Sequence, residues 1–409
     1  MKKKLIKAAI AIGAIVVFPI AAAMLIGLVL NSGFQEMREN PMTGPISAMA
    51  LGNSTVLAVQ PDGELWTWGM VVGRHYSQAA NPYTPILPPE IVEIQGVVTS
   101  VSTFGTGNMS NAQNHAMAVT ADGVLYGWGF NNNGQLGDGT FAMRTTPVRI
   151  KEDVIAVATG QRFTVAITSD GTLYGWGDNT FGQLTVCPSE LEFSNRPIVL
   201  MEGVTAVAAG WGHVLAIMSD GTLYGWGMRT GLGTGALETI ETVAEMARPQ
   251  PTRIKRDVIA IAAGSTHSLA ITSDGTLWAW GGSIFGQVGN GTTGFVPYPV
   301  RIKQDVVAIA TSFMYSAAIT ADGGLYTWGE HDRPQWAAQL DRILPERVMD
   351  DVTQVYVGRF NTMAITADGV LYGWGSNTFG QLQDRTRITR DRPVRIHDFA
   401  LGENTSDDE

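Results

Sequence analysis

Two patterns in the chain combine residue types and spacing that could form a chemical site. The first is the phrase GLGTGA at 231–236, which fits G-x-G-x-x-G/A, the pattern that brings a dinucleotide-binding backbone close to a pyrophosphate. That chemistry requires a βαβ unit around the glycines, and the surrounding sequence has none. The glycines align instead with those of QLGDGT at 135–140, so we expect a structural loop and no nucleotide.

The second pattern is a histidine seven residues before an aspartate, found at His115, His213 and His267. Histidine is a common zinc ligand, but a three-histidine site would need side chains from separate repeats to meet at one point. A repeated histidine that hydrogen-bonds neighbouring backbone explains the spacing without a metal. We therefore expect no metal and no other cofactor.

Catalytic phrases are missing as well. The chain contains no HExxH, CxxC, GxSxG or Walker sequence, and no pair of carboxylates stands out from the loops. Cys187 is the only cysteine, which excludes an intrachain disulfide. We expect a protein that binds and is not an enzyme.

An internal repeat must position any binding residues. The phrase DGTLYGWG occurs at 170–177 and again at 220–227, and near copies begin at 62, 122, 274, 322 and 368. The interval between successive copies is 46 to 60 residues, which is typical of propeller blades. Each unit contains four short strands, with Asp-Gly as the hairpin between the second and third, because glycine accepts the positive φ of a tight turn.

The third strand of each unit indicates how the units pack. In TLYGWG, both faces carry apolar or small groups, so the strand must be buried on both sides. Seven sheets around an axis provide that environment, and we expect an all-β fold, a seven-bladed β-propeller of four-stranded blades, over residues 46–396. An open β-solenoid is the alternative, but neither the first nor the seventh unit resembles the capping repeat that it needs.

The N-terminal segment predicts a membrane anchor. Residues 8–30 carry no charge and are long enough for a transmembrane helix across a ~30 Å hydrocarbon core. Lysines precede this run and the flank after it is not net basic, so the positive-inside rule places the rest of the chain outside the cytoplasm. A cleaved signal peptide is the alternative, with Ala21–Ala23 as the cleavage site. The expected organisation is a basic cytoplasmic end, a single-pass signal-anchor in the cell membrane, a linker, the propeller and an acidic tail, at 1–7, 8–30, 31–45, 46–396 and 397–409.

Charge excludes one class of partner. Four of the 27 basic residues precede the apolar run, so the rest of the chain carries 23 basic residues against 37 acidic ones. An excess of negative charge of this size repels a phosphate backbone. We therefore expect no nucleic-acid partner.

The repeat resembles that of the regulator of chromosome condensation family. The fourth unit contains AAGWGHVLAIMSDGTLYGWG, and the second continues GFNNNGQLGDGT into TPVRI. The resemblance extends over residues 46–396 and implies a seven-bladed propeller. It also suggests a likeness to secreted bacterial members of the family that bind proteins through loop aromatics on one face. The namesake of the family implies another activity, guanine nucleotide exchange on a small GTPase.

The order of strands divides the loops between two ends of the propeller. We call face one the end with the loops between first and second strands and between third and fourth strands, and face two the end with the Asp-Gly hairpins. The hairpins have one length, whereas the face-one loops vary: eight extra residues precede His115, and GQLG is lost after Gly69, Gly227 and Gly329. Variable loops on a rigid scaffold are where binding sites arise, so we expect the site on face one.

Two face-one loops have helical periodicity. They are ALETIETVAEMA at 236–247 and PQWAAQLDRIL at 334–344, and each predicts one or two amphipathic turns. Such turns could form a lid packed on the propeller rim. They could also dock a partner, with Trp336 as a contact.

The tips of the loops between first and second strands are expected to ring the central opening. They are Asn53-Ser54, Gln113-Asn114, Gln161-Arg162, Trp211-Gly212, Ser265-Thr266, Phe313-Met314 and Arg359-Phe360. Aromatic residues and arginine are enriched at interface hot spots, although aromatics at this position could also plug the channel. With Trp336, the candidate partner-binding residues are Arg162, Phe163, Trp211, Phe313, Met314, Arg359 and Phe360.

Three functions are compatible with the sequence. The first is a membrane-tethered, extracytoplasmic scaffold that binds a protein or a surface polymer through face one. The second is guanine nucleotide exchange, which the resemblance implies and which an extracytoplasmic location opposes because GTPases are cytosolic. The third is a hydrolase or lyase at the channel mouth, for which no polar constellation stands out.

Overall fold

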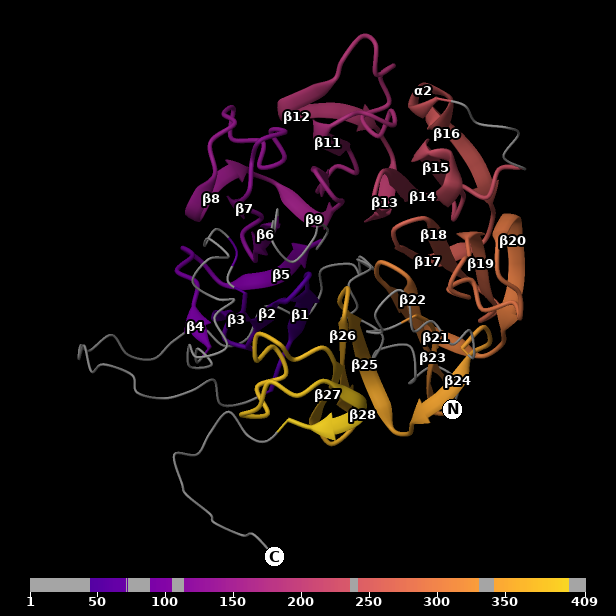
Figure 1. Ribbon diagram of the computed structural model, residues 1–409. Coiled ribbons are helices and arrows are strands. Elements are labelled where there is room, and N and C mark those ends of the chain that lie inside the picture. The colour runs from indigo at the N-terminus through magenta and orange to yellow at the C-terminus, as the bar shows by residue number, and fades with distance from the viewer. Residues whose placement is uncertain are drawn as a thin grey trace, which may run out of the picture.

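The computed structural model describes residues 45–70, 72, 89–104, 114–235, 242–330 and 342–396. Within them, 28 strands form seven antiparallel sheets, and each sheet takes four consecutive strands in chain order. Figure 1 shows the seven sheets arranged as blades around an axis. The expected all-β, seven-bladed propeller is confirmed, and the open solenoid is excluded.

The strands of each blade run from the axis to the circumference (Figure 1). The first strands, next to the axis, are β1 (Ala48–Leu51), β5 (Val98–Thr103), β9 (Val154–Thr159), β13 (Val204–Ala209), β17 (Val258–Ala263), β21 (Val306–Thr311) and β25 (Val352–Val357). The second strands are β2 (Thr55–Val59), β6 (His115–Thr120), β10 (Phe163–Thr168), β14 (His213–Met218), β18 (His267–Thr272), β22 (Tyr315–Thr320) and β26 (Asn361–Thr366). The third strands are β3 (Leu65–Gly69), β7 (Leu125–Gly129), β11 (Leu173–Asp178), β15 (Leu223–Met228), β19 (Leu277–Gly282), β23 (Leu325–Gly329) and β27 (Leu371–Gly375). The outer strands are β4 (Glu90–Ile91), β8 (Arg144–Lys151), β12 (Phe193–Met201), β16 (Ala247–Lys255), β20 (Phe295–Lys303), β24 (Glu346–Met349) and β28 (Arg390–Arg395).

The hydrophobic core lies in the seams between neighbouring blades. One cluster joins Leu269 and Ala279 of the fifth blade to Ile309 and Trp328 of the sixth. The tryptophans of the third strands are among the largest fully buried side chains, as the two-sided apolar pattern of those strands predicts. Each blade therefore depends on its neighbours for the burial of its own apolar surface.

Turn chemistry explains why face two is uniform. The seven hairpin glycines all have φ between 78° and 86°, a conformation that favours glycine. The hairpin aspartate supports the turn: Oδ1 of Asp170, for example, accepts a hydrogen bond of 3.0 Å from the backbone N–H of Thr172. Because these turns are locally determined, they have nearly one length in every blade.

Loop lengths differ on face one. Three residues join the first and second strands in six blades, whereas residues 104–114 join β5 to β6, which confirms the eight-residue insertion. The loops between third and fourth strands range from residues 283–294 in the fifth blade to 70–89 in the first. Variation in loop length is thus concentrated on face one.

Among the described residues, a tryptophan links five of the blades to the loop of the preceding blade. Trp176 Nε1 donates a 2.9 Å hydrogen bond to the backbone oxygen of Gln135, which lies in the loop between β7 and β8. The same bond is made by four other tryptophans among the described residues, Trp68, Trp226, Trp280 and Trp328. In four of the five bonds the acceptor is the glutamine of the repeated Gly-Gln phrase, so the Trp-Gly and Gly-Gln phrases form two halves of one contact between blades.

The repeated histidines strengthen three of these seams. His115 Nε2 lies 2.9 Å from Thr164 Oγ1, and this hydroxyl donates to the same oxygen of Gln135 that Trp176 contacts. His213 pairs with Ser268 and His267 with Ser316 in the same way. The expected bond to neighbouring backbone is therefore wrong in detail, because a hydroxyl of the next blade lies between the ring and the carbonyl.

The ring closes between the seventh and first blades without a shared strand. Trp68 Nε1 donates to the backbone oxygen of Gln381 at 2.9 Å, and side chains of both blades form one buried cluster. The histidine contact is missing at this seam, where Asn361 and Val56 occupy the two positions. Both amide atoms of Asn361 are buried without a hydrogen-bond partner. The closing seam therefore has fewer polar contacts than the histidine seams.

Two expectations about helices need separate outcomes. In the first expected helix, α2 (Val243–Met246) forms a single turn. Ala247, expected to continue this helix, instead begins β16 and pairs with Met228. The same loop also contains a short 3-10 turn, η2 (Arg229–Gly231). Residues 342–344 are not helical, and the rest of that expected helix, with Trp336, lies outside the described residues. Residues 1–44, with the expected anchor, also lie outside them, and none of the described helices could span a bilayer.

Restoring the missing contact should stabilise the closing seam. We expect Val56→Thr with Asn361→His to raise the free energy of unfolding by about 1 kcal/mol more than the two single changes together, because the pair gains a buried hydrogen bond. Urea unfolding of the four proteins measures this coupling. The matched cycle of His213→Asn and Ser268→Ala should show a coupling of similar size, and additivity in both cycles would contradict the assignment.

Acid should weaken the histidine seams. Burial lowers the pKa of His115 and His267 to about 3 and that of His213 to about 4, from an ordinary value of 6.5. The unfolded chain therefore binds more protons between these values, so stability is full above pH 6.5 and falls as the pH drops toward 4. At pH 5.5 each histidine should lower the free energy of unfolding by about 1.4 kcal/mol relative to its value at neutral pH.

The measurement is urea unfolding at pH 7.5 and 5.5. The matched control replaces all three histidines with Asn, the residue that the seventh blade has at this position. We expect the control to lose most of the pH dependence. An equal loss of stability in both proteins would show that other groups cause it.

Candidate interaction site at the centre of face one

The loops between first and second strands surround the axis on face one. We call six of them the face-one mouth, which consists of residues 52–54, 160–162, 210–212, 264–266, 312–314 and 358–360; most of the loop from β5 to β6 lies outside the described residues. Backbone bonds connect neighbouring tips: Trp211 N–H donates to the oxygen of Gly264, and Ser265 N–H to that of Phe313. Arg359 N–H donates to the oxygen of Gly52 across the closing seam. These bonds connect the tips of the fourth, fifth and sixth blades with one another and the tip of the seventh blade with that of the first.

Six of the eight predicted contact residues are partly exposed at this mouth: Arg162, Trp211, Phe313, Met314, Arg359 and Phe360. Phe163 is not available to a partner, because it is fully buried in the cluster between the third and fourth blades. It is the first residue of β10 and occupies the position that histidine has in β6, β14 and β18. Its alignment with the repeated histidines, which are also buried, is the feature of the sequence that could have indicated a core residue. Trp336 lies outside the described residues.

Arg359 stacks between two aromatic rings. Its guanidinium carbon lies 4.3 Å from the centre of the Phe313 ring and 4.7 Å from that of Phe360. Burial lowers the pKa of Arg359, which means that its charged group is partly removed from water. Stacking of this kind holds a guanidinium in one orientation.

A second aromatic cluster lies at the third and fourth blades. Trp211 packs against Phe181 with ring centres 5.7 Å apart, and Phe181 comes from the loop between β11 and β12. Gly212 permits this contact, since a Cβ there would lie only 2.5 Å from Phe181 Cδ2. The sequence interpretation did not include Phe181. Its place in DNTFGQL, one residue before the loop glycine, does not indicate which neighbouring tip it meets.

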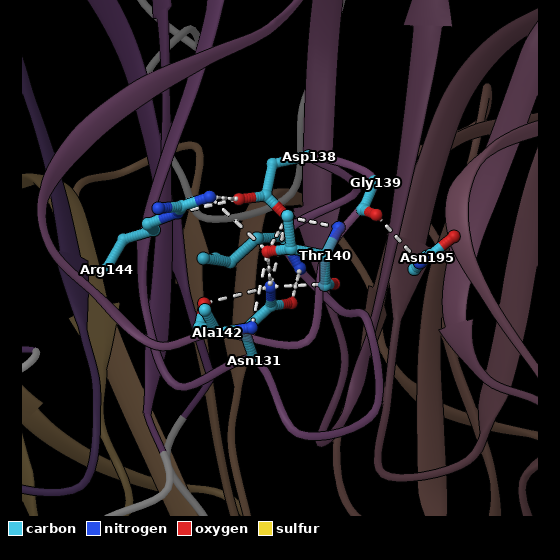
Figure 2. A network of polar contacts seen from close by, with 8 residues as sticks. Asn131, Asp138, Gly139, Thr140, Ala142, Arg144 and Asn195 are labelled. Carbon is cyan, nitrogen blue, oxygen red and sulfur yellow. Dashed lines mark hydrogen bonds and ion pairs between the residues drawn. The ribbon is translucent and has the colours of Figure 1, made fainter.

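The remaining polar network of face one supports the loops. Figure 2 shows Asn131 Nδ2 donating to Asp138 Oδ1 and to the oxygens of Thr140 and Ala142, while Arg144 pairs with Asp138 at 2.6 Å. Burial raises the pKa of Asp138, but hydrogen bonds from Thr140 and Arg144 lower it more, so the carboxylate stays charged. The seventh blade repeats the network with Asn377, Asp384, Thr386 and Arg390.

The described residues contain no group of three or more His, Cys, Asp or Glu side chains that could hold a metal. The repeated histidines lie in separate seams, each bonded to its own hydroxyl. The absence of catalytic activity remains a prediction. What the mouth offers chemically is aromatic surface, two guanidinium groups and backbone that is already held in place.

Family models match several repeats. Two models, both described as the regulator of chromosome condensation (RCC1) repeat, fit the chain: one at residues 122–167 and 274–319, the other at 154–183, 204–228, 258–287 and 352–381. The matched segments fall in six of the seven blades, all but the first. They include the hairpin and Trp-Gly phrases from which the blades are built.

Two curated relatives are similar over part of their length. The chain is 29% identical over 251 residues to the ultraviolet-B receptor UVR8 of Arabidopsis thaliana, covering 60% of this chain and 43% of the relative. It is 29% identical over 268 residues to the E3 ubiquitin-protein ligase HERC2 of Homo sapiens, covering 64% of this chain and 4% of the relative. The chain thus spans less than half the length of these relatives.

Solved structures share the fold. Yeast RCC1 (Prp20), in a structure bound to Kap60, has a TM-score of 0.65 at 20% identity, covering 90% of this chain and 91% of that one. Human WBSCR16 has a TM-score of 0.64 at 20% identity, covering 81% and 93%. At these identities the likeness establishes the propeller fold alone.

Proposed function

Because this chain carries regulator of chromosome condensation repeats and folds as their seven-bladed propeller, we propose that it is a protein-binding scaffold that holds its partner on face one. One observation carries the proposal: partly exposed aromatic and arginine side chains surround the axis at the mouth of the variable face. Side chains of these types contribute most of the binding energy in many protein interfaces.

The packing of the mouth favours contact with a macromolecule. Phe313, Phe360 and Trp211 are held by stacking and by backbone bonds between the tips, so little conformational entropy is lost when a partner covers them. Face two, by contrast, repeats one hairpin around the ring and offers little that could distinguish partners.

A protein partner is favoured over a polymer by what similar propellers do. Yeast Prp20 has been crystallised with Kap60, and a second structure of it is described with its binding to Gsp1p and histones. Those partners belong to that protein. They support a propeller of this fold as a platform for other proteins.

We further propose that residues 8–30 tether the propeller as a single-pass anchor and that the propeller lies outside the cytoplasm. The chain enters β1 and leaves β28 on face two, so a tether after residue 30 would point face one away from the bilayer. Retention of the full chain in the membrane pellet after carbonate extraction, with cleavage by protease added to intact cells, is expected. Release by carbonate or protection from protease would overturn the tether.

Capture of the partner tests the proposed site. We expect a tagged full-length chain to cross-link its partner through face one, and Trp211→Ala or Phe360→Ala to weaken the affinity about thirtyfold each, since a hot-spot aromatic contributes about 2 kcal/mol. A captured small GTPase that releases its nucleotide faster would support exchange instead.

Two matched variants separate contact from folding. Val199→Ala removes an exposed apolar side chain from the outer strand β12 and should leave the affinity unchanged. Phe163→Ala should lower the free energy of unfolding by about 3–5 kcal/mol, whereas the two mouth variants should melt like the wild type. Full affinity in both mouth variants, or cross-links only to the hairpins, would place the partner elsewhere.

A further inference from the structure

Acidic residues are concentrated on face two. The hairpins and the turns from each fourth strand to the next blade contain sixteen acidic residues and a single basic residue, Arg256. Twelve of the sixteen are aspartates in the hairpins or in two-residue turns such as Glu152-Asp153 and Arg256-Asp257. Arginines of the outer strands pair with three of these carboxylates, Arg149 with Glu152 and Arg347 with Asp322 and Asp350, so this end of the propeller carries a net negative charge.

Hydrogen bonds lower the pKa of five hairpin aspartates, which are Asp170, Asp220, Asp274, Asp322 and Asp368. Asp274 Oδ1 accepts hydrogen bonds from the Thr272 hydroxyl at 2.6 Å and from the Thr276 N–H at 3.1 Å, which lowers the pKa of Asp274 to about 2. The pKa of Asp322 is also lowered to about 2, by the Thr320 hydroxyl and by Arg347. Asp274 and Asp322 therefore stay negatively charged at any physiological pH.

The face-one mouth has the opposite charge. Its six loops contain two arginines, Arg162 and Arg359, and no acidic residue. Two acidic residues are joined to the mouth by backbone hydrogen bonds. The N–H groups of Asp178 and Glu330 donate to the backbone oxygens of Arg162 and Met314. The Asp178 carboxylate accepts the Thr180 N–H at 2.6 Å and forms no ion pair with a described residue.

Both mouth arginines are partly desolvated. Arg162 Nε is buried and has no hydrogen-bond partner, and Arg359 is stacked between Phe313 and Phe360. A guanidinium that has already lost part of its water loses less on pairing with a carboxylate than a fully hydrated one, and the bond formed there is charge-assisted. Arg253 on the outer strand β16, by contrast, is exposed.

We propose that the partner inserts an acidic segment, with Asp or Glu interleaved with apolar residues, into the face-one mouth. Arg162 and Arg359 pair with its carboxylates while Trp211, Phe313 and Phe360 cover its apolar side chains. The negative field of face two repels such a partner from the other end and orients its approach. This inference rests on the proposed function, since it names the chemistry of the partner at that site.

Peptides of matched composition test the charge requirement. The probes are three fluorescein-labelled 16-residue peptides that alternate Glu, Gln or Lys with Phe and Leu, titrated against the full-length chain in detergent. We expect the Glu peptide to bind at least tenfold more tightly than the Gln peptide, and its dissociation constant to rise with salt.

Charge-reversal variants locate the site. Arg162→Glu and Arg359→Glu should each lower the affinity for the Glu peptide at least tenfold. Arg253→Glu, the same change on the exposed outer strand β16, should alter that affinity less than twofold. Unchanged melting of all three variants confirms that they fold.

Three results would overturn the inference. They are equal affinity for the Glu and Gln peptides, an equal loss in Arg253→Glu, and tightest binding of the Lys peptide, which would indicate a basic partner on face two. If the captured partner still requires Trp211 and Phe360 but is insensitive to salt and to both arginines, the proposed function stands and the acidic segment does not.

Discussion

The structure depends on one hydrogen bond repeated between blades, from the indole N–H of a third-strand tryptophan to a backbone carbonyl in the loop of the preceding blade. An indole N–H buried without an acceptor is costly, so this bond sets how closely and at what angle two blades can pack. The loop carbonyl is equally constrained, because it accepts from the tryptophan and, at three seams, from the hydroxyl that the histidine contacts. Core and loop are therefore fixed together.

The same arrangement separates the two faces. The loops that supply the carbonyl begin and end on face one, but their Gly-Gln-Leu portions turn inward and are buried. The rest of each loop is free to vary without disturbing a seam. The hairpins of face two have no part that is free to vary, because the aspartate and the glycine form the whole turn. This explains why differences between the blades accumulate on face one.

The mouth gains its binding character from positions where the repeat tolerates change. Trp211 and Arg359 contact the neighbouring tip through their backbone N–H groups, so these contacts do not specify their side chains. Large side chains stand at several of these positions and are held in place near the axis by stacking. Arg359 stacks on Phe313 and Phe360, and Trp211 packs against Phe181. One position further on, at Phe163, the side chain enters the seam, and its identity is decided by what it packs against. Its partner there is Val214, whereas the histidines face a serine or threonine.

The sequence by itself determined the number of blades, their four strands, the hairpins and the face on which loops vary. These features follow from turn chemistry and from apolar alternation, which act over fewer than ten residues and so are visible in one unit. The tertiary structure alone decided that Phe163 is core, that Phe181 joins Trp211, that the histidines bond to hydroxyls, and that the ring closes through Trp68 and Gln381. The physical reason is distance along the chain: those contacts join residues of different blades, and Trp68 and Gln381 are 313 positions apart. A local pattern cannot indicate which of seven similar neighbours a side chain will meet.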